Sequence, residues 1–502
     1  MDMPGYLRWI LVNVVSCMVI LGCGGSSSSD STPPPTPTTP PPAPPPTPPP
    51  PMQLGNPIEG TIEIGSIAVD AVGFVQAPRT EDRVRGGGLN NPDTRIQYLR
   101  QVGERFFFND TRGVLWVTDS EGSEPISYLD LREENVGFNA DRFPQESGFM
   151  SFAFHPDFAN DAAAGFGRFY TTFSATPDGN ADFIEEASSV QESVLYEWSA
   201  TDPMASVFAG ERREMLRVGQ FAPNHNVGTV TFNPTAELGD ADYGMLYVSF
   251  GDGGNAHDPR EHGQNPNSIL GSIIRIDPLG GGDEASYGIP EDNPFADGAD
   301  GLPEVWAYGL RHPQHYSWDT DDGRMFILDI GQNQIEEVNI GVAGGNYGWR
   351  IREGTFATAM GIDTNDSPGG VYERETDSLN LIYPVAQYDH DEGFAIGSGY
   401  VYRGSGLPNL VGMYVFTDIV RGRLFYIDTS SLEPDAPTTI FELDLTVDGE
   451  ASSLADVAGH PNTSPGHAPY DQRVDLRLST DAAGELYILS KGDGWIRKLQ
   501  AR

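Results

Sequence analysis

Cysteine is almost missing from this 502-residue sequence, which contains only Cys17 and Cys23. Both lie within the first 23 residues, so no disulfide can form in the remaining chain. The stability of a domain built from those residues must therefore come from a hydrophobic core or from bound metal ions.

Positive charge is scarce as well. The 30 Lys and Arg residues face 72 Asp and Glu residues, which gives a net charge of −42. So acidic a surface argues against binding to nucleic acid or to an anionic membrane. It suits a high-salt environment, where screening relieves self-repulsion, and it attracts divalent cations. A surface that is merely soluble is equally consistent with this charge.

A membrane-spanning run is not found at the N-terminus, because the apolar stretch from Trp9 to Leu21 is too short to cross a bilayer as a permanent helix. With Arg8 in front of it, the stretch is typical of an export signal over residues 1–22. It ends in Ile-Leu-Gly-Cys23, which resembles the lipobox of bacterial lipoproteins. The resemblance implies cleavage before Cys23 and lipidation of its sulfur. An ordinary secretory signal with a chance cysteine is the alternative.

Residues 23–55 have the composition of a tether. Serines are followed by a Pro/Thr tract from Pro33 to Pro51, which cannot build a core and favours polyproline II. We expect a semi-rigid spacer that holds the domain away from the membrane, to which only the lipid anchor attaches it. Gly24 follows the lipobox cysteine, and in lipoproteins this implies the outer membrane of a Gram-negative bacterium.

Long helical periodicity is rare in residues 56–502, where a strand pattern recurs instead. Each copy has a glycine turn, a strand of large apolar or β-branched residues and often a polar or acidic end. The six copies begin at Gly113, Gly167, Gly244, Gly323, Gly412 and Gly484. Five follow a partner strand that ends in an apolar residue and a turn former, such as Phe154-His-Pro156, so each pair is predicted to be a β-hairpin.

Six hairpin repeats in one glycine-rich chain predict an all-β fold, a six-bladed β-propeller over residues 56–502. A chance series of glycine-led strands in a β-sandwich is the alternative. The usual site of a propeller is the mouth of its central channel, where loops between strands meet. Polar residues in such loops are therefore the candidates for function.

Three signatures stand close together in the second half of the chain. They read Tyr-Gly-Leu-Arg311-His312-Pro, Asp329-Ile-Gly331-Gln332 followed by Glu336-Glu337-Val-Asn, and Gly-Gly-Asn-Tyr347-Gly-Trp. They resemble signatures of the soluble pyrroloquinoline quinone (PQQ)-dependent glucose dehydrogenases and their sorbosone-dehydrogenase-like relatives. Further motifs, among them Gly251-Asp252-Gly-Gly, fall in the family's order, and the resemblance runs from about residue 60 to the C-terminus. It implies a six-bladed propeller that oxidises sugars with PQQ and Ca²⁺.

His225 lies between Asn224 and Asn226, just before a predicted strand. A histidine among small polar residues can act as a general base near neutral pH, although a structural role is the alternative. By resemblance His225 matches the family's catalytic base, and Asn224 is predicted to contact substrate. Arg311 matches the arginine that contacts the quinone oxygens, and His312 beside it stands where the family usually has Asn.

Gly331, Gln332, Glu336 and Glu337 offer backbone and carboxylate oxygens within one short segment. All-oxygen ligation suits Ca²⁺ rather than a soft metal, whereas an acidic solvated turn is the alternative. The resemblance implies Ca²⁺ binding here beside the cofactor, with Tyr347 in the ligand set. No His/Cys cluster has the sequence spacing of a zinc site.

The cofactor pocket departs from the family pattern in several places. Glu146 stands where glucose dehydrogenases have Gln, and we predict that it binds a sugar hydroxyl. PQQ has three carboxylates, so its pocket requires cations. The family's lysine position falls on Val420, and its later arginine pair is displaced. We therefore predict that Arg421, Arg473 and Lys491 supply the cations from neighbouring positions.

The sequence thus favours a PQQ-dependent oxidoreductase that acts on a sugar or polyol and passes electrons to a quinone or cytochrome. A non-catalytic calcium propeller that binds carbohydrate or protein at the cell envelope is the second hypothesis. A propeller hydrolase of the lactone type is a third. Fold resemblance alone does not separate the three.

Overall fold

The computed structural model of the chain describes residues 52–80, 92–184, 189–282, 285–362, 369–374, 379–433, 435–461 and 472–502. The predicted signal peptide, Cys23 and most of the predicted tether lie outside these ranges and stay predictions. Within them, no helix has the length and apolarity that a membrane span requires.

Four-stranded antiparallel sheets make up the domain, and each is one blade of the predicted propeller. Four of the blades are separate sheets. The first two contain β2 (Ile96–Val102), β3 (Arg105–Asp110), β4 (Val114–Asp119) and β5 (Ile126–Asp130), then β6 (Phe149–Phe154), β7 (Arg168–Ala175), β8 (Gln191–Ala200) and β9 (Gly210–Gln220). The next two contain β10 (Val227–Phe232), β11 (Leu246–Phe250), β12 (Ser272–Ile276) and β13 (Val305–Tyr308), then β14 (His315–Trp318), β15 (Met325–Asp329), β16 (Ile335–Ile340) and β20 (Ala386–Asp389).

The last two blades are joined at their outer edges into one eight-stranded sheet. The fifth blade contains β21 (Ile396–Val401), β22 (Met413–Asp418), β23 (Leu424–Asp428) and β24 (Phe441–Val447). The sixth contains β27 (Leu476–Thr480), β28 (Leu486–Ser490), β29 (Trp495–Ala501) and, from the other end of the chain, β1 (Ile64–Gln76). Because β1 pairs antiparallel with β29 and parallel with β24, the N-terminal strand completes the last blade and closes the ring.

The remaining elements are short and lie in connections. They are β17 (Arg352–Glu353), β18 (Phe356–Thr358) and β19 (Val371–Tyr372), the pair β25 (His460–Pro461) and β26 (Gln472–Arg473), α1 (Leu454–Ala458), and the 3₁₀ turns η1 (Pro408–Leu410) and η2 (Thr429–Ser431).

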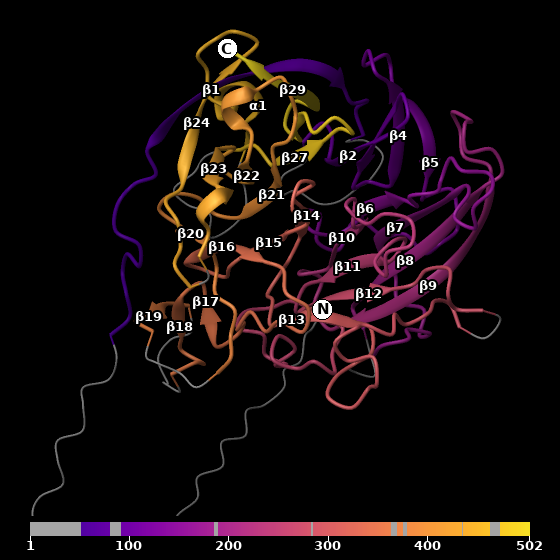
Figure 1. The fold of residues 1–502 in the computed structure, drawn as a ribbon, viewed down its shortest axis with the longest axis horizontal. Coiled ribbons are helices and arrows are strands. Elements are labelled where there is room, and N and C mark those ends of the chain that lie inside the picture. Colours follow the sequence, from indigo (N-terminus) through magenta and orange to yellow (C-terminus); the bar gives the residue numbers. More distant parts are fainter. Residues whose placement is uncertain are drawn as a thin grey trace, which may run out of the picture. The chain divides into compact units, whose positions relative to one another are not determined.

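The first strand of each blade lies nearest the channel axis. These inner strands, β2, β6, β10, β14, β21 and β27, contact one another in a closed circuit that ends back at β2. Figure 1 shows the blades following one another round the domain in chain order. The predicted six-bladed propeller is confirmed by this circuit and by the strand order of the sheets.

In the first blade, the predicted glycine-led strand is the third strand of the sheet rather than the second. Five of the glycine-led strands are the second strands of their blades, whereas the strand that follows Gly113 is β4, the third. The hairpin predicted there does form, between β3 and β4. A short turn at Gly103, with φ of 59°, leads into the second strand β3, which lacks the glycine-led signature.

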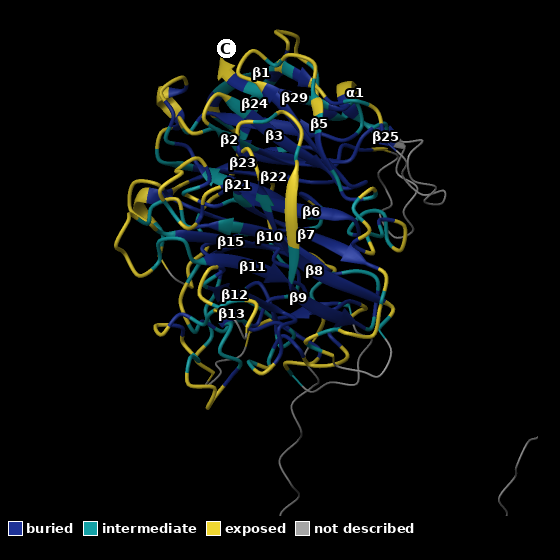
Figure 2. Cartoon of the chain, turned by 90° about the vertical axis from the view of Figure 1, so that its right-hand side faces the viewer, coloured by how far each residue is buried: buried dark blue, intermediate teal, exposed yellow. Residues whose placement is uncertain are grey.

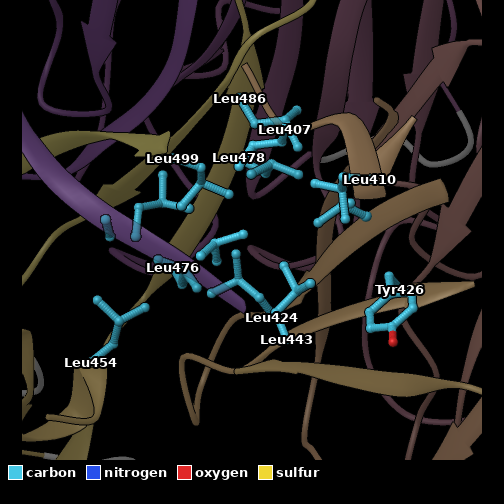
Figure 3. Close-up of a cluster of buried hydrophobic side chains, with 14 of the residues drawn as sticks. Leu407, Leu410, Leu424, Tyr426, Leu443, Leu454, Leu476, Leu478, Leu486 and Leu499 are labelled. Carbon is cyan, nitrogen blue, oxygen red and sulfur yellow. The ribbon is translucent and has the colours of Figure 1, made fainter. Parts of the chain in front are cut away.

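Hydrophobic side chains fill the spaces between blades. Figure 2 shows most of the strands in dark blue, as buried, and most of the exposed residues in loops and at strand ends. Leucines from the fifth and sixth blades belong to one buried cluster in Figure 3, among them Leu424, Leu443, Leu476 and Leu486. Burying one such side chain contributes about 1.5–3 kcal/mol, so these packed faces hold the ring together without disulfides.

Candidate functional site

The residues just before the inner strands meet at one end of the channel. Residues that lead into β6, β10, β14, β21 and β27 line the same opening. A cavity of about 170 Å³ opens there. Eight of the predicted site residues line it: Glu146, His225, Arg311, His312, Gly331, Gln332, Arg473 and Lys491.

His225 leads into β10 and is held by a buried carboxylate. Its Nδ1 lies 2.6 Å from Oδ1 of Asp252, which follows β11, the neighbouring strand. Burial acts to raise the pKa of Asp252, but His225, Arg311 and the Gly254 amide together outweigh burial, and the pKa lies below its usual value. Ionised Asp252 only accepts hydrogen bonds, so in the neutral form of His225 the ring hydrogen is on Nδ1 and the lone pair is on Nε2. This is the arrangement of a general base whose orientation a carboxylate fixes.

Asp252 is itself fixed from two further sides. Its Oδ1 accepts a hydrogen bond from the Gly254 amide at 2.9 Å, and its Oδ2 accepts one from Trp349 Nε1 at 2.8 Å. The His225 backbone has φ of 53°, a left-handed conformation that costs energy for a residue other than glycine. Such strain is found where the surrounding structure fixes a functional side chain.

Arg311 lies beside this pair and lines the same cavity. Its Nη2 is 3.0 Å from His225 Nε2, and its Nη1 donates to the carbonyl oxygens of Ile330 and Gly331 at 3.0 and 2.7 Å. The backbone amide of Arg311 donates to buried Asp329 at 2.8 Å. The guanidinium therefore stands beside the base, where it can polarise an oxygen atom of a bound group.

His312 and Glu146 complete this side of the cavity. Nδ1 of His312 lies 3.4 Å from Oε2 of Glu146. The same carboxylate oxygen accepts a hydrogen bond from the His225 backbone amide at 2.7 Å. Burial, and then the charges of His225 and Arg311, lower the pKa of His312 well below its usual value. His312 is therefore neutral at pH 7. Asn224 is not brought to the cavity, because its side-chain oxygen faces the amide of Asn255 in an adjoining loop.

The sixth blade supplies a wall of buried cations. Arg473, Arg477 and Lys491 line the cavity, and among the described residues of this blade the carboxylate that lines it with them is Asp475, to which Arg473 Nε donates at 2.7 Å. Nη1 of Arg473 is buried and has no hydrogen-bond partner among the described residues. Burial, and then the charge of Arg477, lower the pKa of Lys491 to about 7. An excess of buried positive charge with an unsatisfied donor fits a ligand that carries several carboxylates, as PQQ does.

Arg421 is not among the residues that line the cavity. Val420, its neighbour, lines it instead, and the Arg421 amide donates to Asp418 at 2.6 Å. Arg477, which was not predicted from the sequence, lines the cavity in place of Arg421. Its signal was its position two residues after Asp475 at the start of the last inner strand, where alternate side chains face the channel.

The peptide groups of the predicted calcium loop are oriented as the binding of a cation requires. Oε1 of Glu353 accepts the backbone amides of Gln332, Asn333, Gln334 and Ile335 at 2.8–3.1 Å. With the amides turned toward Glu353, the carbonyls of Ile330 and Gly331 face the cavity and a positive group, Arg311 Nη1. Gln332 also lines the cavity. Neutral carbonyl oxygens that face a positive group suit Ca²⁺, and here the group that they accept from is Arg311 Nη1.

Of the other predicted calcium ligands, Glu336 contacts this loop, since its Oε2 accepts the Gly331 amide at 3.3 Å, whereas Glu337 and Tyr347 face other groups. Glu336 and Glu337 are adjacent on β16, so their side chains project to opposite faces of the strand. Glu336 faces His390 and the Ile396 amide, at 2.9 and 2.8 Å. Glu337 accepts the Gly354 amide at 2.5 Å, and burial raises its pKa to about 8. The Tyr347 hydroxyl donates to the Ile340 carbonyl at 2.8 Å.

Glu353→Ala is expected to lower the free energy of unfolding by about 1–3 kcal/mol, because four backbone amides lose their common acceptor. The isosteric Glu353→Gln keeps an acceptor oxygen and should lose less. Urea unfolding of both variants measures the difference. Equal stability of Glu353→Ala and the unaltered protein would contradict the role assigned to Glu353.

The model of a known protein family, described as Glucose / Sorbosone dehydrogenase, matches residues 94–442. The chain belongs to this family. HIPL1 protein of Arabidopsis thaliana is 33% identical over 352 residues, which are 62% of this chain and 46% of that protein. Quinoprotein glucose dehydrogenase B of Acinetobacter calcoaceticus is 25% identical over 212 residues, 41% of this chain and 40% of that protein. The chain spans about half the length of the curated relatives that it matches first.

Solved structures show the same architecture. The PQQ-bound form of aldose sugar dehydrogenase from Streptomyces coelicolor matches with a TM-score of 0.51 and 20% identity, over 83% of this chain and 95% of that one. At this identity the likeness concerns the fold. Glucose/sorbosone dehydrogenase family membership therefore fixes the scaffold, and the chemistry is argued from the cavity of this chain.

Proposed function

We propose that this member of the glucose/sorbosone dehydrogenase family is a PQQ-dependent oxidoreductase that oxidises a hydroxyl group of a sugar or polyol. The observation that carries the proposal is the His225–Asp252 pair, 2.6 Å apart. Its other ring nitrogen, Nε2, lies 3.0 Å from Arg311 in a cavity that three further basic side chains line. A base for a hydroxyl proton and a binding surface for a polyanion thus stand in one opening.

The residues assigned to the cofactor are Arg473, Arg477 and Lys491 for its carboxylates and Arg311 for its quinone oxygens. Gly331 and Gln332 are assigned to Ca²⁺. When bound, PQQ supplies the acceptor for the hydride that leaves the carbon atom of the alcohol. The three cations have low exposure, and this strengthens charge-assisted hydrogen bonds to carboxylates.

Residues of the chain accept the proton of the substrate hydroxyl and stabilise the charge that results. His225 Nε2 takes the proton of the substrate hydroxyl as the C–H bond breaks, and the ionised Asp252 stabilises the imidazolium that results. Arg311 and Glu146 bracket the ring and position the substrate oxygen. The neutral His312 adds a polar contact without adding charge.

The proposed site of electron delivery is the cell envelope. A lipid on Cys23 and the tether to residue 55 would keep the enzyme close to membrane-bound or periplasmic acceptors, a quinone or a cytochrome. Cys23→Ser, expressed in a bacterium that processes lipoproteins, is expected to move the protein from the detergent-extracted membrane fraction to the aqueous one. Unchanged fractionation would contradict the anchor.

Titration of the purified chain with PQQ tests the proposed function at the level of binding. We expect one PQQ per chain, with affinity that rises when Ca²⁺ is added and falls when it is chelated. A chain that binds no PQQ with Ca²⁺ in excess would not be a quinoprotein. The second reading, a propeller that binds carbohydrate or protein without catalysis, would then be the one to pursue.

A further inference from the structure

Three metal-ligating side chains from three different blades meet beside the channel axis. Glu146 precedes β6, His225 precedes β10 and His312 precedes β14. One ligand atom from each lies within 4.8 Å of the others, and the two imidazole rings are 5.0 Å apart between centroids with an angle of 31°. About 80 residues separate each from the next, so sequence spacing gives no sign of the group.

Each of the three residues is held by hydrogen bonds to its neighbours: His225 through its ring, His312 through its backbone amide and Glu146 through its carboxylate. His225 Nδ1 is bound to Asp252, which leaves Nε2 as the ligand atom. The His312 backbone amide donates to Asp329 at 2.7 Å, and Glu146 Oε2 is held by the His225 amide. A carboxylate behind a histidine is the usual outer support of a histidine that binds a metal ion.

We propose that Glu146, His225 and His312 form a site for a divalent transition metal, with Zn²⁺ as the best match. Two neutral imidazole nitrogens and one carboxylate make the ligand set of open zinc and iron sites. In tetrahedral zinc, neighbouring ligand atoms lie about 3.3 Å apart. Glu146 Oε2 and His312 Nδ1 are already 3.4 Å apart, so only His225 Nε2 has to approach.

Arg311 acts against the binding of a metal ion at this site. Its Nη2 lies 3.0 Å from His225 Nε2, on the lone pair that the metal ion would use. Metal binding therefore displaces one side of the guanidinium and brings two positive charges near each other. Zn²⁺ and Arg311 compete for His225, and a bound Zn²⁺ ion removes the proposed base. Removing the Arg311 charge should consequently tighten zinc binding, whereas removing a ligand should weaken it.

The test is calorimetric titration of the full chain with Zn²⁺, without PQQ or sugar and with Mg²⁺ in excess to occupy the many acidic surface groups. We expect one zinc site, weakened at least about tenfold in Glu146→Gln and in His312→Gln and tightened in Arg311→Met. His155→Gln is the matched control, because His155 follows the opposite end of β6 and lies 3.8 Å from Asp157.

Thermal unfolding of each variant shows that it is folded, and Co²⁺ absorption reports the coordination directly. The proposal is overturned if the unaltered chain binds no Zn²⁺ above the level of the Glu146→Gln,His312→Gln double variant. It is overturned equally if both single variants bind as the unaltered chain does. Because neither result involves PQQ, failure of the zinc site and failure of the proposed dehydrogenase activity are distinguishable.

Discussion

His225→Ala is expected to lower kcat for sugar oxidation by about 10²–10⁴, the usual contribution of a positioned general base. The reason is geometric. The pair with Asp252 turns Nε2 of a buried ring toward the cavity beside Arg311, and among the described histidines that line the cavity His225 is the one paired with a buried carboxylate through Nδ1. Steady-state dye reduction with PQQ and Ca²⁺ measures the loss.

PQQ affinity supplies the control for this variant. His225 is not part of the cation wall, so His225→Ala should bind PQQ within a few-fold of the unaltered chain. Asp252→Asn keeps the shape of the partner but removes its charge, and we expect a smaller loss of kcat with an altered pH profile. Full activity of His225→Ala would contradict the assigned base, and loss of both binding and activity would indicate a structural role.

Lys491→Met is expected to move PQQ affinity and stability in opposite directions. A hydrogen bond between charged groups contributes about 1.5–3 kcal/mol, so PQQ binding should weaken by about tenfold to a hundredfold. The apo protein should become more stable, since burial has lowered the pKa of Lys491 from its ordinary 10.5 to about 7. Methionine fills a similar volume and carries no charge to desolvate.

The pH dependence of this gain follows from the direction of the pKa shift. The unfolded chain holds the Lys491 proton up to about pH 10.5, whereas the folded chain releases it near pH 7. Wild-type stability contributed by this residue therefore rises with pH between the two values. The advantage of Lys491→Met should be largest below pH 7 and disappear near pH 10.5. Urea unfolding across this pH range measures the change in stability, and PQQ titration at pH 6 and 8 measures the change in affinity. A Lys491→Met variant that is less stable than the unaltered protein would contradict the assignment of Lys491 to ligand binding.

Much of the architecture could be predicted because it is local. A glycine turn and the apolar strand that follows it occupy consecutive residues, so the pattern can be recognised in the sequence. Five of the six copies of this pattern are the second strands of their blades. Ring closure is not local. The pairing of β1 with β29 joins residues more than 400 positions apart, and nothing in residues 64–76 marks them as the outer strand of the last blade.

The candidate site shows the same division. His225 and Arg311 stand in recognisable segments, and the structure brings them to 3.0 Å from each other. Asp252 was visible only as part of a motif, since its contact with His225 depends on the pairing of β10 with β11. The cluster of Glu146, His225 and His312 depends on three blades meeting at the axis. Distances across a closed ring cannot be obtained from spacing along the chain.

The most direct test of the account is the rate at which the purified chain, loaded with PQQ and Ca²⁺, reduces a dye when a panel of aldoses and polyols is supplied. The account predicts a rate that requires PQQ, depends on the sugar and is lost in His225→Ala. A chain that binds PQQ in the cavity but reduces no dye with any member of the panel, at any pH between 6 and 9, would contradict it.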